Sequence, residues 1–171
     1  GGLGGTFSWY NKIETDSELG GFSMHVAQTK DTMSDLYLDA VRLRQRVFVA
    51  EQGVPEEMEI DEYEARCIHF VLYTVHVAVA TCRLLPLENG VMKLQRMAVE
   101  KAYRGADYGR MIMEAAENFA KEQGYHKITL GAQVTAVGFY ERLGYQKTGA
   151  PFMDAGIEHY EMNKELSLPP S

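Results

Sequence analysis

A glycine-containing stretch between a strand-like and a helix-like segment constrains the fold of this chain more than any other feature. The stretch is YRGADYGR, residues 103–110, with two glycines and two arginines. Residues 91–99 before it alternate as in a β-strand, and residues 109–124 after it repeat at helical spacing. Glycine lets a backbone approach a ligand closely, and the first free N–H groups of a helix attract an anion. The junction therefore indicates either an anion-binding loop or a tight turn that uses glycine for geometry alone.

The composition favours a single globular domain and limits its partners. The chain has 171 residues, 46% of them hydrophobic, which is enough for one domain with a sizeable core. Its net charge of -7 argues against a nucleic-acid partner, which requires a basic surface. No apolar run is long enough to span a membrane. An acidic chain that binds an anion must gather positive charge locally, and residues 93–110 do so with three arginines and two lysines.

We expect no functional role for the N-terminal segment or for the two cysteines. Residues 1–20 begin with GGLGGTFSWY, which lacks the basic and apolar regions of a signal peptide. We interpret these residues as a flexible tail or a cloning remnant before a domain at residues 22–166, and we expect a cytoplasmic protein. Cys67 and Cys82 lie in apolar runs without metal-ligand spacing, so we expect buried thiols and no metal site.

Hydrophobic periodicity predicts an α/β fold of the mixed α+β kind, with about six to seven strands and about four helices. The expected helices run from a cap at Asp31 or Thr32 to Gly53, over residues 109–124, and over residues 135–145. Residues 55–65 are acidic and irregular, with at most one short helical turn.

The sheet should be mixed but mostly antiparallel, because a run of antiparallel strands passes into a strand–helix–strand unit. Asn89-Gly90 predicts a type I′ hairpin turn, and a loop containing Pro151 is expected between the last two strands. The expected strands are residues 22–28, two strands within 66–87 that break near residues 74–76, and then 91–99, 126–132, 145–150 and 157–166.

A second motif, GFYERLGY at residues 138–145, puts two aromatic residues on a short helix that stops at glycine. Phe139 and Leu143 are four residues apart, which suits a core-facing side, and Tyr140 lies one step off that side. Tyr140 could simply pack in the core. It could instead face a cleft, where a phenol can donate a proton to a leaving group.

Taken in order, these segments resemble the GNAT N-acetyltransferase superfamily. The resemblance rests on LQRMAV (94–99), YRGADYG (103–109) and LGAQVTAVGFYERLGY (130–145), and it covers about residues 22–166. VFVAEQ at residues 47–52 is similar to a helix end in one bacterial branch of predicted acetyltransferases. The resemblance implies a GNAT-like acyl-CoA N-acyltransferase fold. It also implies transfer of an acetyl group from acetyl-CoA to a primary amine by direct attack.

Two other classes of function stay open at this point. A non-catalytic module that binds or senses CoA would keep the same fold, and so would a structural or interaction protein. The acceptor amine, on a small molecule or a peptide, cannot be read from the sequence. The resemblance adds a homodimer as an assembly to test, by analogy alone.

The resemblance also implies roles for individual residues. Met97, Ala98 and Val99 would offer backbone groups to the acetyl carbonyl and the pantetheine arm. Gln133 would contact the cofactor, and Tyr140 would protonate the departing CoA thiolate. The pyrophosphate loop would consist of Arg104, Gly105, Ala106, Asp107, Tyr108, Gly109 and Arg110.

Asp107 departs from the family pattern, which has glycine at this position. A side chain there could crowd the cofactor, and a carboxylate would repel pyrophosphate. Three interpretations compete: Asp107 faces outward and caps the following helix, it weakens CoA binding, or the site has lost CoA. Replacing Asp107 with glycine and measuring the affinity for acetyl-CoA distinguishes them.

The general base is the least defined part of the site. An attacking amine must be neutral, so a carboxylate or an imidazole usually takes its proton. The branch pattern favours Glu51 at the end of the first helix and then His69 in an apolar strand, although such residues are often solvated or structural. Arg96 could hold an anionic part of the acceptor. The acidic residues 56–64 could favour a cationic acceptor or form a solvated surface.

Overall fold

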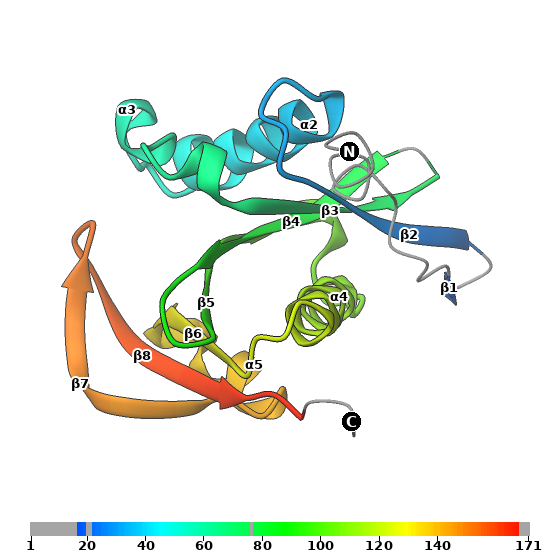
Figure 1. Ribbon diagram of the computed structural model, residues 1–171. Coiled ribbons are helices and arrows are strands. Elements are labelled where there is room, and N and C mark those ends of the chain that lie inside the picture. Colours follow the sequence, from blue (N-terminus) through cyan, green and yellow to red (C-terminus); the bar gives the residue numbers. More distant parts are fainter. Residues whose placement is uncertain (1–16, 20–21, 76, 168–171) are drawn as a thin grey trace. The chain divides into compact units, whose positions relative to one another are not determined.

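Figure 1 shows a computed structural model, which describes residues 17–19, 22–75 and 77–167. Most of the expected N-terminal tail, residues 1–16, lies outside the described residues. In the part of the chain that is described, no helix combines the length and the apolar character needed to cross a membrane.

The chain divides into two compact units. The first unit comprises residues 1–84 and 96–116, and the second comprises residues 85–95 and 117–171. Three elements contribute residues to both units, namely strands β4 (Val77–Pro86) and β5 (Val91–Val99) and helix α4 (Tyr108–Glu122). The expectation of a single domain stays a prediction.

The first unit is built on antiparallel strands in the order β1-β2-β3-β4. Strand β2 (Phe22–Thr29) pairs with β3 (Ile68–Thr74), and β3 pairs in turn with β4. The chain reverses at Val75, where φ is 43°, so the predicted break in this region is confirmed. Strand β1 (Ser17–Leu19) pairs with β2 inside the segment interpreted as a tail, and no sequence signal predicted it.

Helix α2 (Asp35–Arg44) lies across β2 and β3 (Figure 1) and begins later than predicted. Its N-cap is Ser34, whose hydroxyl accepts a hydrogen bond from the N–H group three residues on, at 3.2 Å. The prediction of Asp31 or Thr32 was wrong because the Asp31 carboxylate accepts from the Met33 N–H instead, at 2.8 Å. Met33, expected on the apolar face, therefore precedes the helix and is 90% exposed.

The predicted helix continues beyond α2 as a π-helical segment, Gln45–Glu51. Val47 of this segment is buried against Leu43 and Ala98, and the partly buried Phe48 packs on the same cluster. The short helix α3 (Glu56–Glu59) and a 3-10 turn (Glu64–Arg66) follow in the acidic segment.

The second unit contains the only parallel pairing that is described. Residues Val91–Leu94 of β5 run parallel to β6 (Lys127–Gln133). Strand β6 pairs antiparallel with β8 (Ile157–Glu165), and β8 pairs antiparallel with β7 (Gln146–Asp154). The prediction of a mixed, mostly antiparallel sheet is confirmed.

The helices and the hairpin turn also follow the sequence pattern. The predicted stripe on α4 is buried, since its residues are all 5% exposed or less: Ile112, Ala115, Ala116, Phe119 and Ala120. Helix α5 (Val137–Arg142) carries the Phe-Tyr pair. Asn89 and Gly90 have φ values of 62° and 74°, as a type I′ turn requires.

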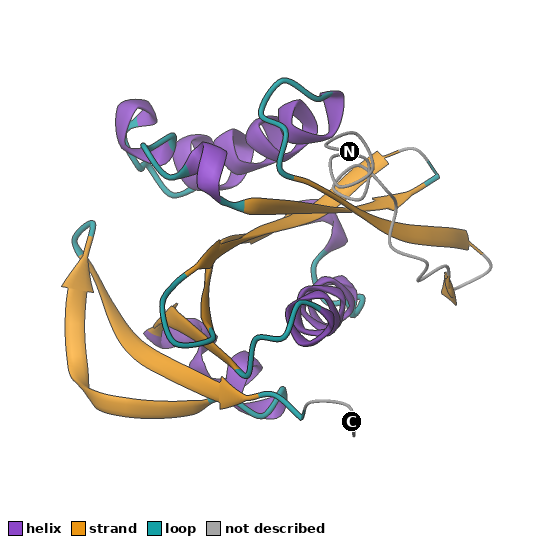
Figure 2. Cartoon of the chain, in the orientation of Figure 1, coloured by secondary structure: helices purple, strands orange, loops and turns teal. Residues whose placement is uncertain are grey.

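The last two strands differ from the prediction. Figure 2 shows β7 and β8 as long strands joined by a short turn. This turn is formed by Ala155 and Gly156, both with positive φ, and not by the segment around Pro151. Pro151 instead lies inside β7, where the register shifts between Thr148 and Phe152. An edge strand with a bulge tolerates proline because its N–H group is not needed for pairing.

Candidate functional site

Strand β5 changes conformation just before the residues predicted to contact the cofactor. Arg96 has a φ of 56°, which is uncommon for a residue other than glycine. Its guanidinium donates to the carbonyl oxygen of Glu59 at 3.2 Å and to Oδ2 of Asp61 at 3.2 Å. Strained backbone of this kind persists only where the surroundings hold it, and it is frequent at functional sites. Residues 97–99 follow directly.

The predicted cofactor strand rests on the end of the first helix. Ala98 is 4% exposed and packs against Leu43 and Val47, whereas Met97 and Val99 are half-buried. The carbonyl oxygen of Val99 accepts a hydrogen bond from Nε of Arg104 at 3.0 Å. The strand end is therefore packed on its apolar side and connected to the loop by its backbone.

The loop between β5 and α4 contains two left-handed residues. Gly105 has a φ of 84° and Asp107 a φ of 72°. No atom lies within 4 Å of the place where a Cβ of residue 105 would stand, so glycine is favoured there by its φ and not by lack of space. The positive φ at position 107 likewise suits the glycine that the resemblance implies there. Aspartate is one of the few other residues that adopt this conformation.

The Asp107 carboxylate faces the solvent and binds Arg110. The side chain is 48% exposed, and its two oxygens accept hydrogen bonds from Nε of Arg110 at 3.0 and 2.9 Å. Arg110 also binds Glu114 at 2.7 Å. The hydrogen bonds from Arg110 lower the pKa of Asp107. A helix cap usually has extended backbone, and Asp107 does not, so its ion pair with Arg110 is the better-supported role.

Arg104, the first residue of the predicted loop, binds Glu51. The two side chains form a bidentate pair, with Nη1 to Oε1 at 2.7 Å and Nη2 to Oε2 at 2.9 Å. Hydrogen bonding to Arg104 lowers the pKa of Glu51, and the charge of Lys101 acts in the same direction. The first candidate for the general base is thus an ionised carboxylate that already has a partner.

His69, the second candidate, is held inside the first unit. It is 1% exposed, and its Nε2 lies 2.8 Å from the carbonyl oxygen of Glu64. A carbonyl oxygen only accepts, so Nε2 carries the proton. The ring of Tyr37 packs edge-on against the imidazole at 4.8 Å between centroids. Burial lowers the pKa of His69 to about 4, so the ring is neutral at pH 7.

A buried charge network was not predicted from the sequence. Its two arginines are each 1% exposed, and its carboxylates come from the acidic segment. We call it the buried network, and its members are Arg44 and Arg83 with Glu59, Asp61 and Glu64. Burial would raise the pKa of Glu64, but hydrogen bonds from Arg44 and Tyr37 outweigh burial and lower the pKa to about 2. Arg83 stands in an otherwise apolar run, whereas Arg44 lies among other polar residues of the first helix, so the sequence did not mark the two as partners.

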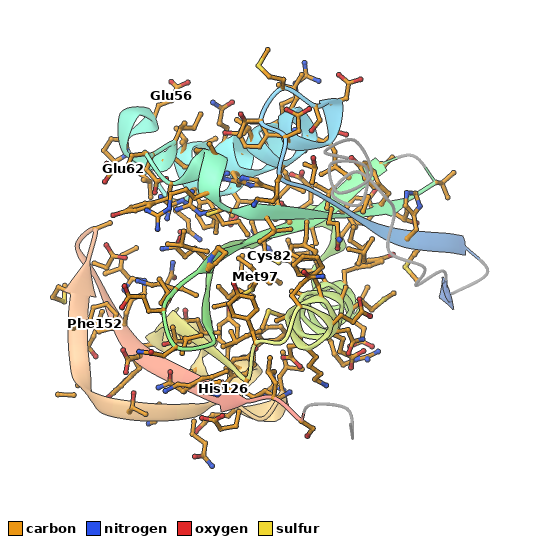
Figure 3. All side chains as sticks on the ribbon, in the orientation of Figure 1. Glu56, Glu62, Cys82, Met97, His126 and Phe152 are labelled. Atoms are coloured by element: carbon orange, nitrogen blue, oxygen red, sulfur yellow. The ribbon has the colours of Figure 1, made fainter. Side chains whose placement is uncertain are left out.

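The acidic segment is therefore not one uniform surface. Its buried carboxylates belong to the network, whereas Glu56 and Glu62 lie on its outer side (Figure 3) and are exposed. The buried network leaves fewer carboxylates for a cationic acceptor than the sequence suggested. Both cysteines are buried as predicted, and burial raises the pKa of the Cys67 thiol to about 11.

The two remaining predicted residues belong to the second unit. Gln133 is half-buried at the end of β6, opposite His159 of β8. Tyr140 is 7% exposed on α5, and its ring contacts Phe139 and Tyr145 edge-on at 5.0 and 5.9 Å between centroids. Tyr145 anchors this end of α5, because its N–H donates to the Tyr140 carbonyl at 3.0 Å.

Tyr145 is fixed by a second small network. Its hydroxyl donates to Glu117 at 2.9 Å, and Nζ of Lys164 also donates to Glu117 at 2.9 Å. Glu117 and Lys164 were missing from the sequence prediction, since they lie far apart along the chain.

Among the described residues, no group of three or more His, Cys, Asp and Glu side chains is placed to hold a metal ion.

Comparison with known proteins supports the resemblance. The sequence model of the acetyltransferase (GNAT) domain family matches residues 30–166. The uncharacterised N-acetyltransferase YjcF of Bacillus subtilis is 41% identical over 128 residues, which is 74% of this chain and 91% of that protein. YyaT, an uncharacterised protein of the same organism, is 37% identical over 139 residues, 80% of this chain and 93% of its own length.

A solved structure also supports the resemblance to N-acetyltransferases. The crystal structure of a candidate N-acetyltransferase from Lactobacillus plantarum matches with a TM-score of 0.79 and 33% identity, over 84% of this chain and 99% of that one. The family's sequence model covers most of the chain, and the relatives are matched over nearly their whole length. This chain therefore belongs to the GNAT acetyltransferase family, whose general activity is acyl transfer from acyl-CoA.

Proposed function

We propose that this protein transfers an acetyl group from acetyl-CoA to a primary amine of a small molecule or a peptide. The observation that carries the proposal is the junction between β5 and the 15-residue helix α4. There, Gly105 and Asp107 adopt left-handed backbone between the cationic Arg104 and Arg110. Free N–H groups at a helix start, together with arginines, suit a pyrophosphate.

The remaining predicted residues have matching chemistry. The backbone of residues 97–99 would bind the acetyl carbonyl and the pantetheine arm, and Gln133 would contact the cofactor with its amide. The loop Arg104–Arg110 would hold the pyrophosphate. The exposure of residues 104–107 supports this assignment, because a cofactor has access to their backbone.

The proposed reaction is direct attack without an enzyme-bound intermediate. The neutral amine attacks the acetyl carbonyl, a C–N bond forms, and the C–S bond to CoA breaks. The base takes the proton that the amine loses, and the Tyr140 hydroxyl gives its proton to the departing thiolate. Glu51 is the first choice for the base because its carboxylate is partly exposed, and the buried His69 is the second.

Thiol release from acetyl-CoA with a panel of amines tests this function. At least one primary amine is expected to raise the rate above hydrolysis. Tyr140→Phe should then lower kcat by about 10²-fold or more, the usual contribution of a proton donor. Tyr125→Phe removes a hydroxyl from the same unit and serves as the matched control. Equal rates for the Tyr140 variant and the wild type would remove Tyr140 from the mechanism.

The role of Glu51 has a separate test. Glu51→Gln should change the pH dependence of kcat/KM, because the group that takes the proton is lost. An unchanged profile would exclude Glu51, and the same measurement on His69→Gln would then decide on the second candidate.

The ion pairs of the loop favour a second candidate function, a module that binds or senses CoA without catalysis. Both loop arginines are already neutralised, Arg104 by Glu51 and Arg110 by Asp107. Calorimetric binding of CoA without thiol release for any amine would support this alternative. A cytoplasmic location and a homodimer belong to the proposal as well, and sedimentation analysis tests the dimer.

A further inference from the structure

The end of the first helix is tied to the predicted pyrophosphate loop by the pair between Glu51 and Arg104. We propose that Glu51 competes with the pyrophosphate of CoA for Arg104, and that cofactor binding releases the Glu51 carboxylate to serve the acceptor amine. This inference rests on the proposed function. It adds an order of events, in which the cofactor completes the site before the amine loses its proton.

The geometry of Arg104 makes the two partners exclusive. Nη1 and Nη2 both point at the Glu51 carboxylate, and Nε donates to the Val99 carbonyl. A phosphate is bound best by the same fork of two parallel N–H groups. The Arg104 side chain is 42% exposed, so an anion can approach it and exchange with the carboxylate.

The position of Glu51 is fixed by packing. Glu51 ends the π-helical segment, in which Val47 is buried on Ala98 and Phe48 packs beside it. The segment that carries the carboxylate thus rests on the same strand that is predicted to bind the acetyl group. π-helical turns inside helices are frequent at functional sites. A released Glu51 would therefore stay near this strand, because its backbone is anchored.

The exchange has a chemical consequence for the base. While Glu51 is paired, Arg104 and Lys101 lower its pKa, which makes the carboxylate a weak proton acceptor. A pyrophosphate that takes over Arg104 and adds negative charge nearby would raise that pKa towards its ordinary value. The base would then gain strength when the cofactor is bound, and the empty enzyme would keep it inactive.

Calorimetric titration of five proteins tests the competition: the wild type, Glu51→Gln, Glu100→Gln, Arg104→Gln, and a double variant with both Glu51→Gln and Arg104→Gln. Glu100 is the matched control. It lies close to Arg104 in the sequence, but its carboxylate pairs with Arg46 instead, at 2.7 Å. Each glutamate variant loses one negative charge in the same region. The probes are CoA and pantetheine, and pantetheine lacks the pyrophosphate.

Glu51→Gln is expected to bind CoA about two- to fivefold more tightly, the range that an exposed ion pair can supply. Its affinity for pantetheine should not change, and neither should the CoA affinity of Glu100→Gln. In a protein that already carries Arg104→Gln, Glu51→Gln should have no further effect, because the contested group is gone.

Equal tightening by both glutamate variants would overturn the inference, since the effect would then be general electrostatics. An unchanged or weaker CoA affinity in Glu51→Gln would overturn it as well. The proposed function fails in a different way, when neither the wild type nor any variant binds CoA. Thermal unfolding of each variant confirms that the exposed substitutions leave the fold intact.

Discussion

Two sets of arginine–carboxylate pairs in the first unit differ mainly in exposure. The buried network holds Arg44 and Arg83, each 1% exposed. The pairs of the loop, which we call the loop pairs, are Arg104 with Glu51 and Arg110 with Asp107. The arginine side chains of the loop pairs are 42% and 43% exposed. The ionic chemistry is the same, but only the loop pairs face the solvent.

The difference separates the structural role of the buried network from the functional role that we propose for the loop pairs. A buried charge cannot lose its partner without a large cost, because no water replaces the lost hydrogen bonds. The network therefore fixes the acidic segment against α2 and β4. An exposed pair contributes little to stability, and a ligand can replace either partner. The exposure of the loop pairs suits them to exchange, as the proposed cofactor loop requires.

Arg83→Met should have the largest effect on stability. It leaves Asp61 and Glu64 without the guanidinium that binds both, so we expect a loss of about 3–5 kcal/mol in the free energy of unfolding. Urea denaturation at pH 7 measures it. Arg46→Met is the exposed control, with a side chain that is 51% exposed and an expected cost of about 1 kcal/mol or less. Similar costs for both variants would contradict the distinction.

The contribution of Glu64 to the stability of the buried network depends on pH. Its pKa is about 2 in the folded protein against an ordinary value of 4.5, so its contribution is fully present above about pH 4.5. The contribution is lost as the pH falls towards the folded value, because the unfolded chain then binds the proton more tightly. The shift corresponds to about 3 kcal/mol. Urea denaturation from pH 7 to 2.5 should show a smaller acid-induced loss in Glu64→Gln than in the wild type.

Glu56→Gln is the control for this experiment. Glu56 belongs to the same acidic segment but is exposed, so its variant should follow the wild-type pH curve. If Glu64→Gln also followed that curve, the network would not hold Glu64 ionised.

Asp107 tests the loop pairs. Asp107→Gly should bind acetyl-CoA more tightly, by about two- to fivefold, because a carboxylate next to the pyrophosphate is removed and Arg110 is released. Its stability should change little, since glycine adopts the observed φ of 72° readily. Asp107→Ala removes the same charge but should destabilise the fold by about 1 kcal/mol through its left-handed backbone. Equal CoA affinity in Asp107→Gly and the wild type would show that Asp107 does not weaken binding.

The sequence predicted the elements well where one periodicity dominates. The stripe of α4 and the turn at Asn89-Gly90 needed only local information. The cap of α2 was missed because Asp31 and Ser34 are both good caps, and the choice depends on the Asx turn that Asp31 makes with Met33. A strand with Pro151 was missed because its bulge depends on pairing with β8.

Predictions for the site were possible where a motif is local, and distant partners left no signal in the sequence. The loop and Tyr140 stand in short motifs, and their roles are still predictions. Arg83 lies in a strand that is buried on both faces, so no alternation marks it as unusual. Its partner Glu64 is 19 residues away, and the Arg104 partner Glu51 is 53 residues away. A single sequence carries no signal for such pairings.

The smallest expected effect on stability comes from His126 in the second unit. Its ion pair is exposed, like the loop pairs, but we propose no ligand for it. Its Nδ1 lies 3.2 Å from Glu165, and its Nε2 lies 2.9 Å from the Asn89 carbonyl (His126 is labelled in Figure 3). The hydrogen bond to Glu165 raises the pKa of His126, so its stabilising contribution is present below the unfolded pKa of about 6.5. That contribution is lost as the pH rises through the folded pKa, because the folded protein then gives up its extra proton.

The measurement is the melting temperature of the wild type and of His126→Gln between pH 5 and pH 9. The wild type should be slightly more stable at pH 5, and the difference should shrink as the pH rises. Glu165→Gln should reproduce the loss at pH 5, since it removes the partner that favours the imidazolium. A large difference in melting temperature, or one that grows with pH, would mean that exposed ion pairs stabilise this protein more than our proposal for the loop pairs assumes. Exchange of Glu51 for a phosphate would then be harder than we propose, because an exposed pair would have to be broken at a higher cost.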